Sequence, residues 1–137
     1  MKEKFSKKSL DYAKQMVKIM QELKEEVVFV EGKRDKAALS ALGITKTFAI
    51  SGTLRAVCEK LASANVAKVV VLTDLDRRGN ELAELAQQEL ERYSIFANTD
   101  YRRILGKVLR IKHFEELDKK YNEYLEELTW QRHTLIQ

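Results

Sequence analysis

Residues 68–79, KVVVLTDLDRRG, decide the fold. The apolar, β-branched run at the start of this stretch is typical of a buried strand in a parallel sheet. Asp74 and Asp76 follow the run directly. Residues 27–35, VVFVEGKRD, show the same arrangement, with Glu31 after the apolar run. Because ligands bind beyond the carboxyl ends of parallel strands, we expect the three acids at one edge of the sheet.

Strand-like and helix-like segments alternate along the chain. Helical periodicity separates the apolar runs and also flanks them at both ends. This alternation predicts an α/β fold with an approximately four-stranded parallel sheet, right-handed crossovers and helices on both faces. The expected strands are 27–31, 46–51, 68–73 and 94–97, and the expected helices are 6–24, 34–42, 53–65, 80–92, 101–109 and 113–128, followed by an irregular end.

The length of 137 residues favours one domain. Within it we expect a packed N-terminal helix (1–24), an α/β core (25–100) and a C-terminal helical extension (101–137). Apolar residues recur at three- and four-residue spacing in the first helix, which predicts one buried face. The residues of that predicted face are Leu10, Ala13, Val17, Met20 and Leu23.

The composition argues against a membrane or secreted protein. Apolar residues make up 45% of the chain and charged residues 34%, as in ordinary globular domains. No apolar run approaches the roughly 20 residues that cross a bilayer, and no apolar stretch follows the basic N-terminus. The single cysteine, Cys58, excludes an internal disulfide and is expected in the core. These features favour a cytoplasmic location.

Basic residues are concentrated in two segments. Residues 1–24 hold seven lysines against three acids, and residues 101–112, YRRILGKVLRIK, hold five basic residues and no acid. Each segment is either a solvated helix face or a contact with nucleic-acid phosphates. Contact with phosphates would make DNA or RNA a partner, the expectation that the acidic motifs and their flanking basic residues also favour. A protein partner or a homodimer is the other possibility, given the apolar residues of the tail.

The three acids suit a hard divalent cation. Residues two apart in an extended segment point to the same side, so Asp74 and Asp76 can face one ion. Glu31 joins them if the first and third strands are neighbours. Carboxylate oxygens are ligands for Mg²⁺ or Mn²⁺, which usually complete their shells with water and phosphate. The alternative is that acids after strands simply cap the helices that follow.

Basic residues follow both acidic motifs at the expected starts of helices. Helix N-termini already favour anions, so these side chains could bind a nucleic-acid backbone. They are Lys33, Arg34, Arg77 and Arg78. His113 and His133 lie far from the acids in sequence, and both are expected to be surface residues.

Three motifs together resemble the Toprim domain: VVFVEGKRD at 27–35, AISGT at 49–53 and VVVLTDLDRRG at 69–79. The resemblance covers about residues 25–100, and the whole chain resembles small stand-alone Toprim proteins of archaea. It implies a Toprim-like Rossmannoid fold in which Asp74 and Asp76 bind Mg²⁺. It also implies that Glu31 is a general acid or base in nucleotidyl transfer or strand cleavage. The residues expected at tight turns are Gly32, Gly52 and Gly79.

The resemblance implies metal-dependent phosphodiester chemistry on nucleic acid, as in a nuclease or an RNA maturase. The alternative is a non-catalytic Toprim module that binds nucleic acid or protein, and hydrolysis of a small phosphorylated metabolite is a third idea. A primase zinc domain is excluded by the cysteine count. DRRG at 76–79 matches part of a GTPase motif, but no phosphate-binding loop of the GxxxxGK[ST] type is present.

Overall fold

The computed structural model describes residues 7–136 and shows an α/β fold built on one parallel sheet. The sheet order is β2-β1-β3-β4, so β1 and β3 are neighbours, which is the condition for Glu31 to lie near the two aspartates. Val28 of β1 lies opposite Thr47 of β2 on one side and Val70 of β3 on the other. The strands are β1 (Val28–Val30), β2 (Thr47–Ala49), β3 (Lys68–Val71) and β4 (Phe96–Asn98).

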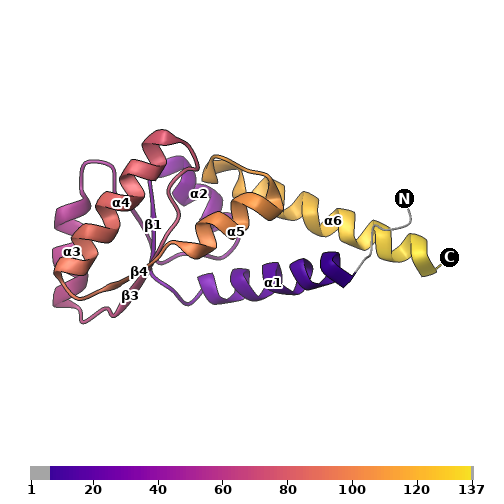
Figure 1. Ribbon diagram of the computed structural model, residues 1–137, viewed down its shortest axis with the longest axis horizontal. Helices are drawn as coiled ribbons and strands as arrows, with labels where there is room; N and C mark the ends of the chain where they lie inside the picture. Colours follow the sequence, from indigo (N-terminus) through magenta and orange to yellow (C-terminus); the bar gives the residue numbers. More distant parts are fainter. Residues whose placement is uncertain (1–6, 137) are drawn as a thin grey trace.

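Helices cover both faces of the sheet (Figure 1). One face packs against α3 and α4, through a core that includes Phe29, Val71 and Leu90. The other face is covered by α1, α2, α5 and α6, through a core that includes Phe114. Alternate strand residues point to opposite faces, which explains why β1 and β3 are apolar throughout. The helices are α1 (Lys7–Leu23), α2 (Lys33–Ala41), α3 (Leu54–Ser63), α4 (Arg77–Arg92), α5 (Asp100–Leu109) and α6 (Leu117–Ile136).

The buried face of α1 differs from the predicted one. Leu10 and Val17 are 41% and 40% exposed, although both were expected to be buried. The buried residues of α1 are Met16, Ile19, Met20 and Leu23. Figure 1 shows that the N-terminal end of α1 extends away from the sheet, which accounts for the exposure of Leu10. Val17 lies in the C-terminal half of α1 between buried Met16 and Ile19, so it is exposed because it lies on the outer side of the helix.

Two helices also begin or end more than two residues from the predicted positions. α4 begins at Arg77 rather than at residue 80, because Asp76 caps it by accepting a hydrogen bond from the Gly79 N–H. The predicted helix 113–128 is a 3₁₀ turn, η2 (Phe114–Glu116), followed by α6. α6 continues to Ile136, so the expected irregular end from residue 129 was wrong.

Cys58 is buried, as predicted, and burial raises the pKa of its thiol to about 11. This environment suits a structural side chain rather than a reactive thiolate. Within residues 7–136, no helix combines the length and the apolar composition needed to cross a membrane.

A hydrogen bond from Tyr101 of α5 to Glu22 joins α5 to α1. This bond, together with burial, raises the pKa of Tyr101 to about 12. An unfolded tyrosine has a pKa of about 10, so the stabilisation is complete below that pH and is lost as pH rises towards 12. We expect Tyr101→Phe to cost about 1 kcal/mol at pH 8 and less at pH 11, measured by urea unfolding. An equal cost at both pH values would contradict this assignment.

Candidate metal centre

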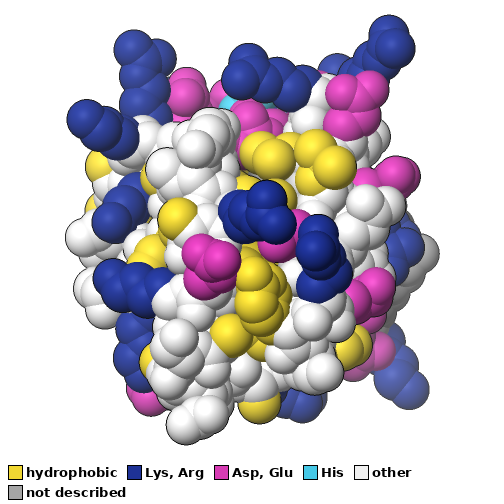
Figure 2. Space-filling view, turned by 90° about the vertical axis from the view of Figure 1, so that its left-hand side faces the viewer, with side chains coloured by type: hydrophobic (Ala, Val, Ile, Leu, Met, Phe, Trp, Pro, Cys, Tyr) yellow, Lys and Arg dark blue, Asp and Glu magenta, His cyan; other side chains and the backbone are white. Residues whose placement is uncertain are grey.

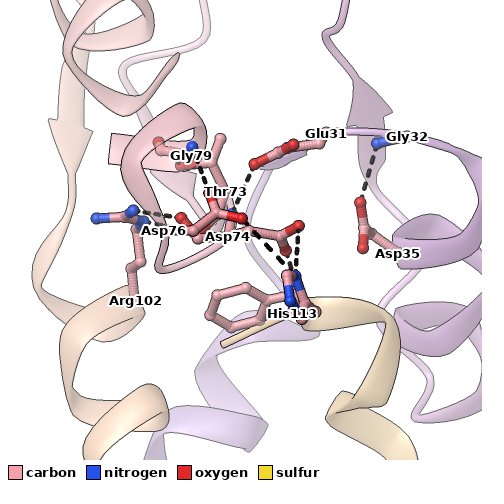
Figure 3. Close-up of polar contacts among 10 residues, drawn as sticks. Glu31, Gly32, Asp35, Thr73, Asp74, Asp76, Gly79, Arg102 and His113 are labelled. Atoms are coloured by element: carbon pink, nitrogen blue, oxygen red, sulfur yellow. Dashed lines mark hydrogen bonds and ion pairs between the residues drawn. The ribbon is translucent and has the colours of Figure 1, made fainter. Parts of the chain in front are cut away.

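The acid that follows β1 contacts the backbone of an acid that follows β3. Glu31 follows β1, and its Oε2 accepts a hydrogen bond of 2.8 Å from the Asp74 N–H (Figure 3). The contact joins residues 43 positions apart in sequence. It forms because parallel pairing of β1 with β3 brings both strand ends to the same edge.

Asp74 is held by two groups from the C-terminal extension. Its Oδ1 accepts a hydrogen bond of 2.9 Å from the Phe114 N–H. Its Oδ2 lies 3.2 Å from Nδ1 of His113. The Asp74 side chain is only 16% exposed, so these contacts fix its orientation.

Asp76 is held by the start of α4. Its Oδ1 accepts a hydrogen bond of 2.7 Å from the Gly79 N–H, and Thr73 Oγ1 donates to the Gly79 carbonyl at 2.7 Å. The Asp76 side chain remains 41% exposed. The turn therefore orients one carboxylate oxygen by a backbone donor and leaves the residue accessible to a ligand.

Arg102 supports the acidic edge from within. We expected the basic segment 101–112 to face solvent or phosphate, but Arg102 is only 6% exposed. Its Nε donates to the Thr73 carbonyl at 2.7 Å, and its Nη2 donates to the Asp74 carbonyl and to Asn80 Oδ1. Arg102 therefore hydrogen-bonds to the segment that carries the acids and does not face solvent. Burial lowers the pKa of its guanidinium.

Negative charge is concentrated at this edge. Burial, and then the charges of Asp74 and Asp76, raise the pKa of Glu31, although its bond from the Asp74 N–H opposes this. The hydrogen bond to Asp74 is the largest cause of a raised pKa for His113. Asp35 is also buried, which raises its pKa, and it accepts a hydrogen bond of 3.0 Å from the Gly32 N–H. A bound cation would relieve the repulsion among these carboxylates.

The donors that converge are Asp74, Asp76 and His113. One ligand atom from each lies within 4.8 Å of the other two. Glu31 is not a member of this group among the described residues, so its role as a direct ligand stays a prediction. Two carboxylates and one imidazole form a donor set that fits a divalent first-row metal ion. The site thus fits a metal, with one donor that the sequence did not reveal.

The predicted phosphate-binding residues surround this edge. They lie in the first turns of α2 and α4, and all are exposed: Lys33, Arg34, Arg77 and Arg78. Figure 2 shows histidine and acidic side chains together at the upper edge of the molecule, with Lys and Arg side chains on either side. Of the predicted turn glycines, Gly52 has a positive φ of +79° and Gly32 is the extended N-cap of α2. Gly79 lies in the first turn of α4.

Comparisons with known proteins agree with this description. Residues 26–105 match the family model of the Toprim domain. The UPF0292 protein of Methanocaldococcus jannaschii is 35% identical over 67% of this chain and 77% of its own length. That of Pyrococcus abyssi is 35% identical over 72% of this chain and 74% of its own. A solved structure of an Aquifex aeolicus protein superposes with a TM-score of 0.64 at 32% identity, covering 71% of this chain and 93% of that one.

Proposed function

Because this chain belongs to the Toprim domain family, whose members are nucleic-acid-related and usually bind divalent metal, we propose that it is a Mg²⁺- or Mn²⁺-dependent nuclease. Its substrate is a phosphodiester bond of DNA or RNA, and its activity resembles that of an RNA maturase. The observation that carries this proposal is the cluster of Asp74, Asp76 and His113 at the carboxyl edge of the sheet, with the Glu31 carboxylate hydrogen-bonded to the Asp74 N–H beside it. We propose a cytoplasmic location.

Asp74 and Asp76 would hold the metal, which supplies Lewis-acid stabilisation of negative charge on phosphate oxygens. The exposed basic residues at the starts of α2 and α4 bind the phosphates on either side of the scissile bond. Helix N-termini add backbone N–H donors at the same place. Substrate is therefore drawn to the acidic edge by positive charge that surrounds it.

Glu31 is the proposed general acid or base. Its Oε2 is occupied by the Asp74 N–H, which fixes the carboxylate in position. A carboxylate held in this way can exchange a proton with a substrate or water oxygen within hydrogen-bond reach. Its location beside Asp74 places the proton-transfer group next to the proposed metal ligands.

The second candidate is a binding module without catalysis. The exposed residues Leu10, Val17 and Trp130 lie on α1 and α6, which extend beyond the sheet (Figure 1). A second copy of the chain or a protein partner could cover them. In that case the basic residues of α1 would contribute to binding nucleic acid, with an affinity that falls steeply with salt.

Cleavage of labelled single-stranded DNA, duplex DNA, structured RNA and a free nucleotide, with Mg²⁺, Mn²⁺ or a chelator, tests the proposal. We expect metal-dependent cleavage of one nucleic acid, and a rate lowered about 100-fold by Glu31→Gln. Glutamine can still accept the Asp74 N–H bond, so the fold should not change. Glu59→Gln, at an exposed position of α3, is the matched control and should leave the rate unchanged.

An unchanged rate in Glu31→Gln would remove Glu31 from the mechanism. Binding without cleavage under every metal condition would favour the binding module, and hydrolysis of the nucleotide alone would indicate a small phosphorylated substrate.

A further inference from the structure

His113 reaches the acidic edge through the backbone that flanks it. The Lys112 carbonyl accepts a hydrogen bond of 2.7 Å from the Leu75 N–H, and the Phe114 N–H donates to Asp74. The Phe114 ring is fully buried in the core on the α1 side of the sheet. These three anchors fix the histidine next to both aspartates (Figure 3).

In each aspartate a backbone N–H binds one carboxylate oxygen, and the other oxygen lies near the histidine. Oδ1 of Asp74 is taken by Phe114, and Oδ1 of Asp76 is taken by Gly79. The Oδ2 atoms of Asp74 and Asp76 lie 3.2 Å and 3.9 Å from His113 Nδ1. In an octahedral site with bonds of about 2.1 Å, adjacent ligand atoms are about 3 Å apart and opposite ones about 4 Å. The two distances to Nδ1 therefore lie in the range expected for atoms bound to one ion, and the two aspartates each offer an oxygen within 4.8 Å of the other.

We infer that His113 Nδ1, on releasing to solvent the proton that it shares with Asp74, is a metal ligand that gives this site a preference for a transition-metal ion such as Mn²⁺ over Mg²⁺. Imidazole nitrogen binds the later first-row ions most tightly and Mn²⁺ more weakly, but Mg²⁺ is the harder ion and selects oxygen, so a nitrogen donor favours Mn²⁺ relative to Mg²⁺. This inference rests on the proposed metal-dependent function and names the ion that the site selects. Because residues 26–105 contain the Toprim match, the nitrogen donor comes from outside that match.

Binding of MnCl₂ and MgCl₂ to the full chain, without nucleic acid, tests the inference. Isothermal titration gives the two affinities, and pulsed EPR of bound Mn²⁺ detects ¹⁴N coupling from a coordinated imidazole. We expect ¹⁴N coupling in the wild type and its loss in His113→Ala. We also expect Mn²⁺ affinity to fall about tenfold in this variant, with Mg²⁺ affinity changed less than about twofold. His133→Ala removes the other histidine and is the matched control.

Bound Mn²⁺ without ¹⁴N coupling in the wild type would overturn the ligand role of His113, while leaving the carboxylate site in place. Coupling that persists in His113→Ala, or equal losses of Mn²⁺ and Mg²⁺ affinity, would also overturn it. A wild type that binds neither ion would instead contradict the proposed function itself.

Discussion

Replacing Asp74 with asparagine is expected to lower divalent-metal affinity by about 100-fold or more and to reduce cleavage below detection. Asp74 supplies one of the converging donor atoms and has the least exposed side chain of the two aspartates. An amide is a weaker ligand and carries no negative charge. Titration of MnCl₂ by calorimetry, together with the cleavage assay, measures both effects.

The same substitution should leave the metal-free fold almost unchanged. The asparagine oxygen can still accept the Phe114 N–H, and removal of one carboxylate relieves repulsion from Glu31 and Asp76. We expect the unfolding free energy without metal to change by less than about 1 kcal/mol. Asp11→Asn, on the exposed surface of α1, is the control. If Asp74→Asn bound metal normally, the proposed centre would be in the wrong place.

Gly79→Ala is expected to destabilise the protein by about 3 kcal/mol and to lower its Tm by about 10 °C. A Cβ on Gly79 would lie 1.8 Å from the Asp74 carbonyl oxygen and 2.5 Å from its carbonyl carbon. These are backbone atoms, and the same carbonyl also accepts a hydrogen bond from buried Arg102. The turn must therefore open, which moves both aspartates.

Thermal and urea unfolding measure the effect, and Gly32→Ala is the matched control. Gly32 has an extended backbone with φ of −148°, and a Cβ there would meet nothing within 4 Å. Its replacement should cost about 1 kcal/mol or less, the usual difference between glycine and alanine as an N-cap. Similar stabilities for the two variants would show that the turn adapts to a side chain at Gly79.

The sheet could be predicted because several local signals agreed. The β-branched runs of β1 and β3 are apolar on both faces, which distinguishes a buried parallel strand from an exposed one. The family resemblance was confirmed, and the contact between Glu31 and Asp74 lies where strand pairing predicts. The exposure of Leu10 could not be predicted, because periodicity shows which residues share a face but not how far the sheet extends beneath it. Val17 is exposed for another reason: Met16 and Ile19 are buried instead, and the apolar spacing did not show which of these neighbouring residues would face the core.

The position of His113 could not be predicted for a different reason. It depends on the hydrogen bond between the Leu75 N–H and the Lys112 carbonyl. Every residue except proline has these backbone groups, so the sequence does not show which of them will pair. Arg102 was misplaced because a basic residue in a basic segment gives no sign of burial. Its burial is favourable because it donates hydrogen bonds to the carbonyls of Thr73 and Asp74 and to Asn80 Oδ1, partners that the sequence does not reveal.

The contact between Phe114 and Asp74 also has a consequence for synthesis of the chain. A ribosome makes the strands and both aspartates before it makes the segment that orients Asp74. While that segment is still inside the exit tunnel, the Asp74 carboxylate lacks its backbone donor and its histidine neighbour. The nascent domain can therefore pair its strands early, but its acidic edge is completed only after residues 112–114 have left the exit tunnel.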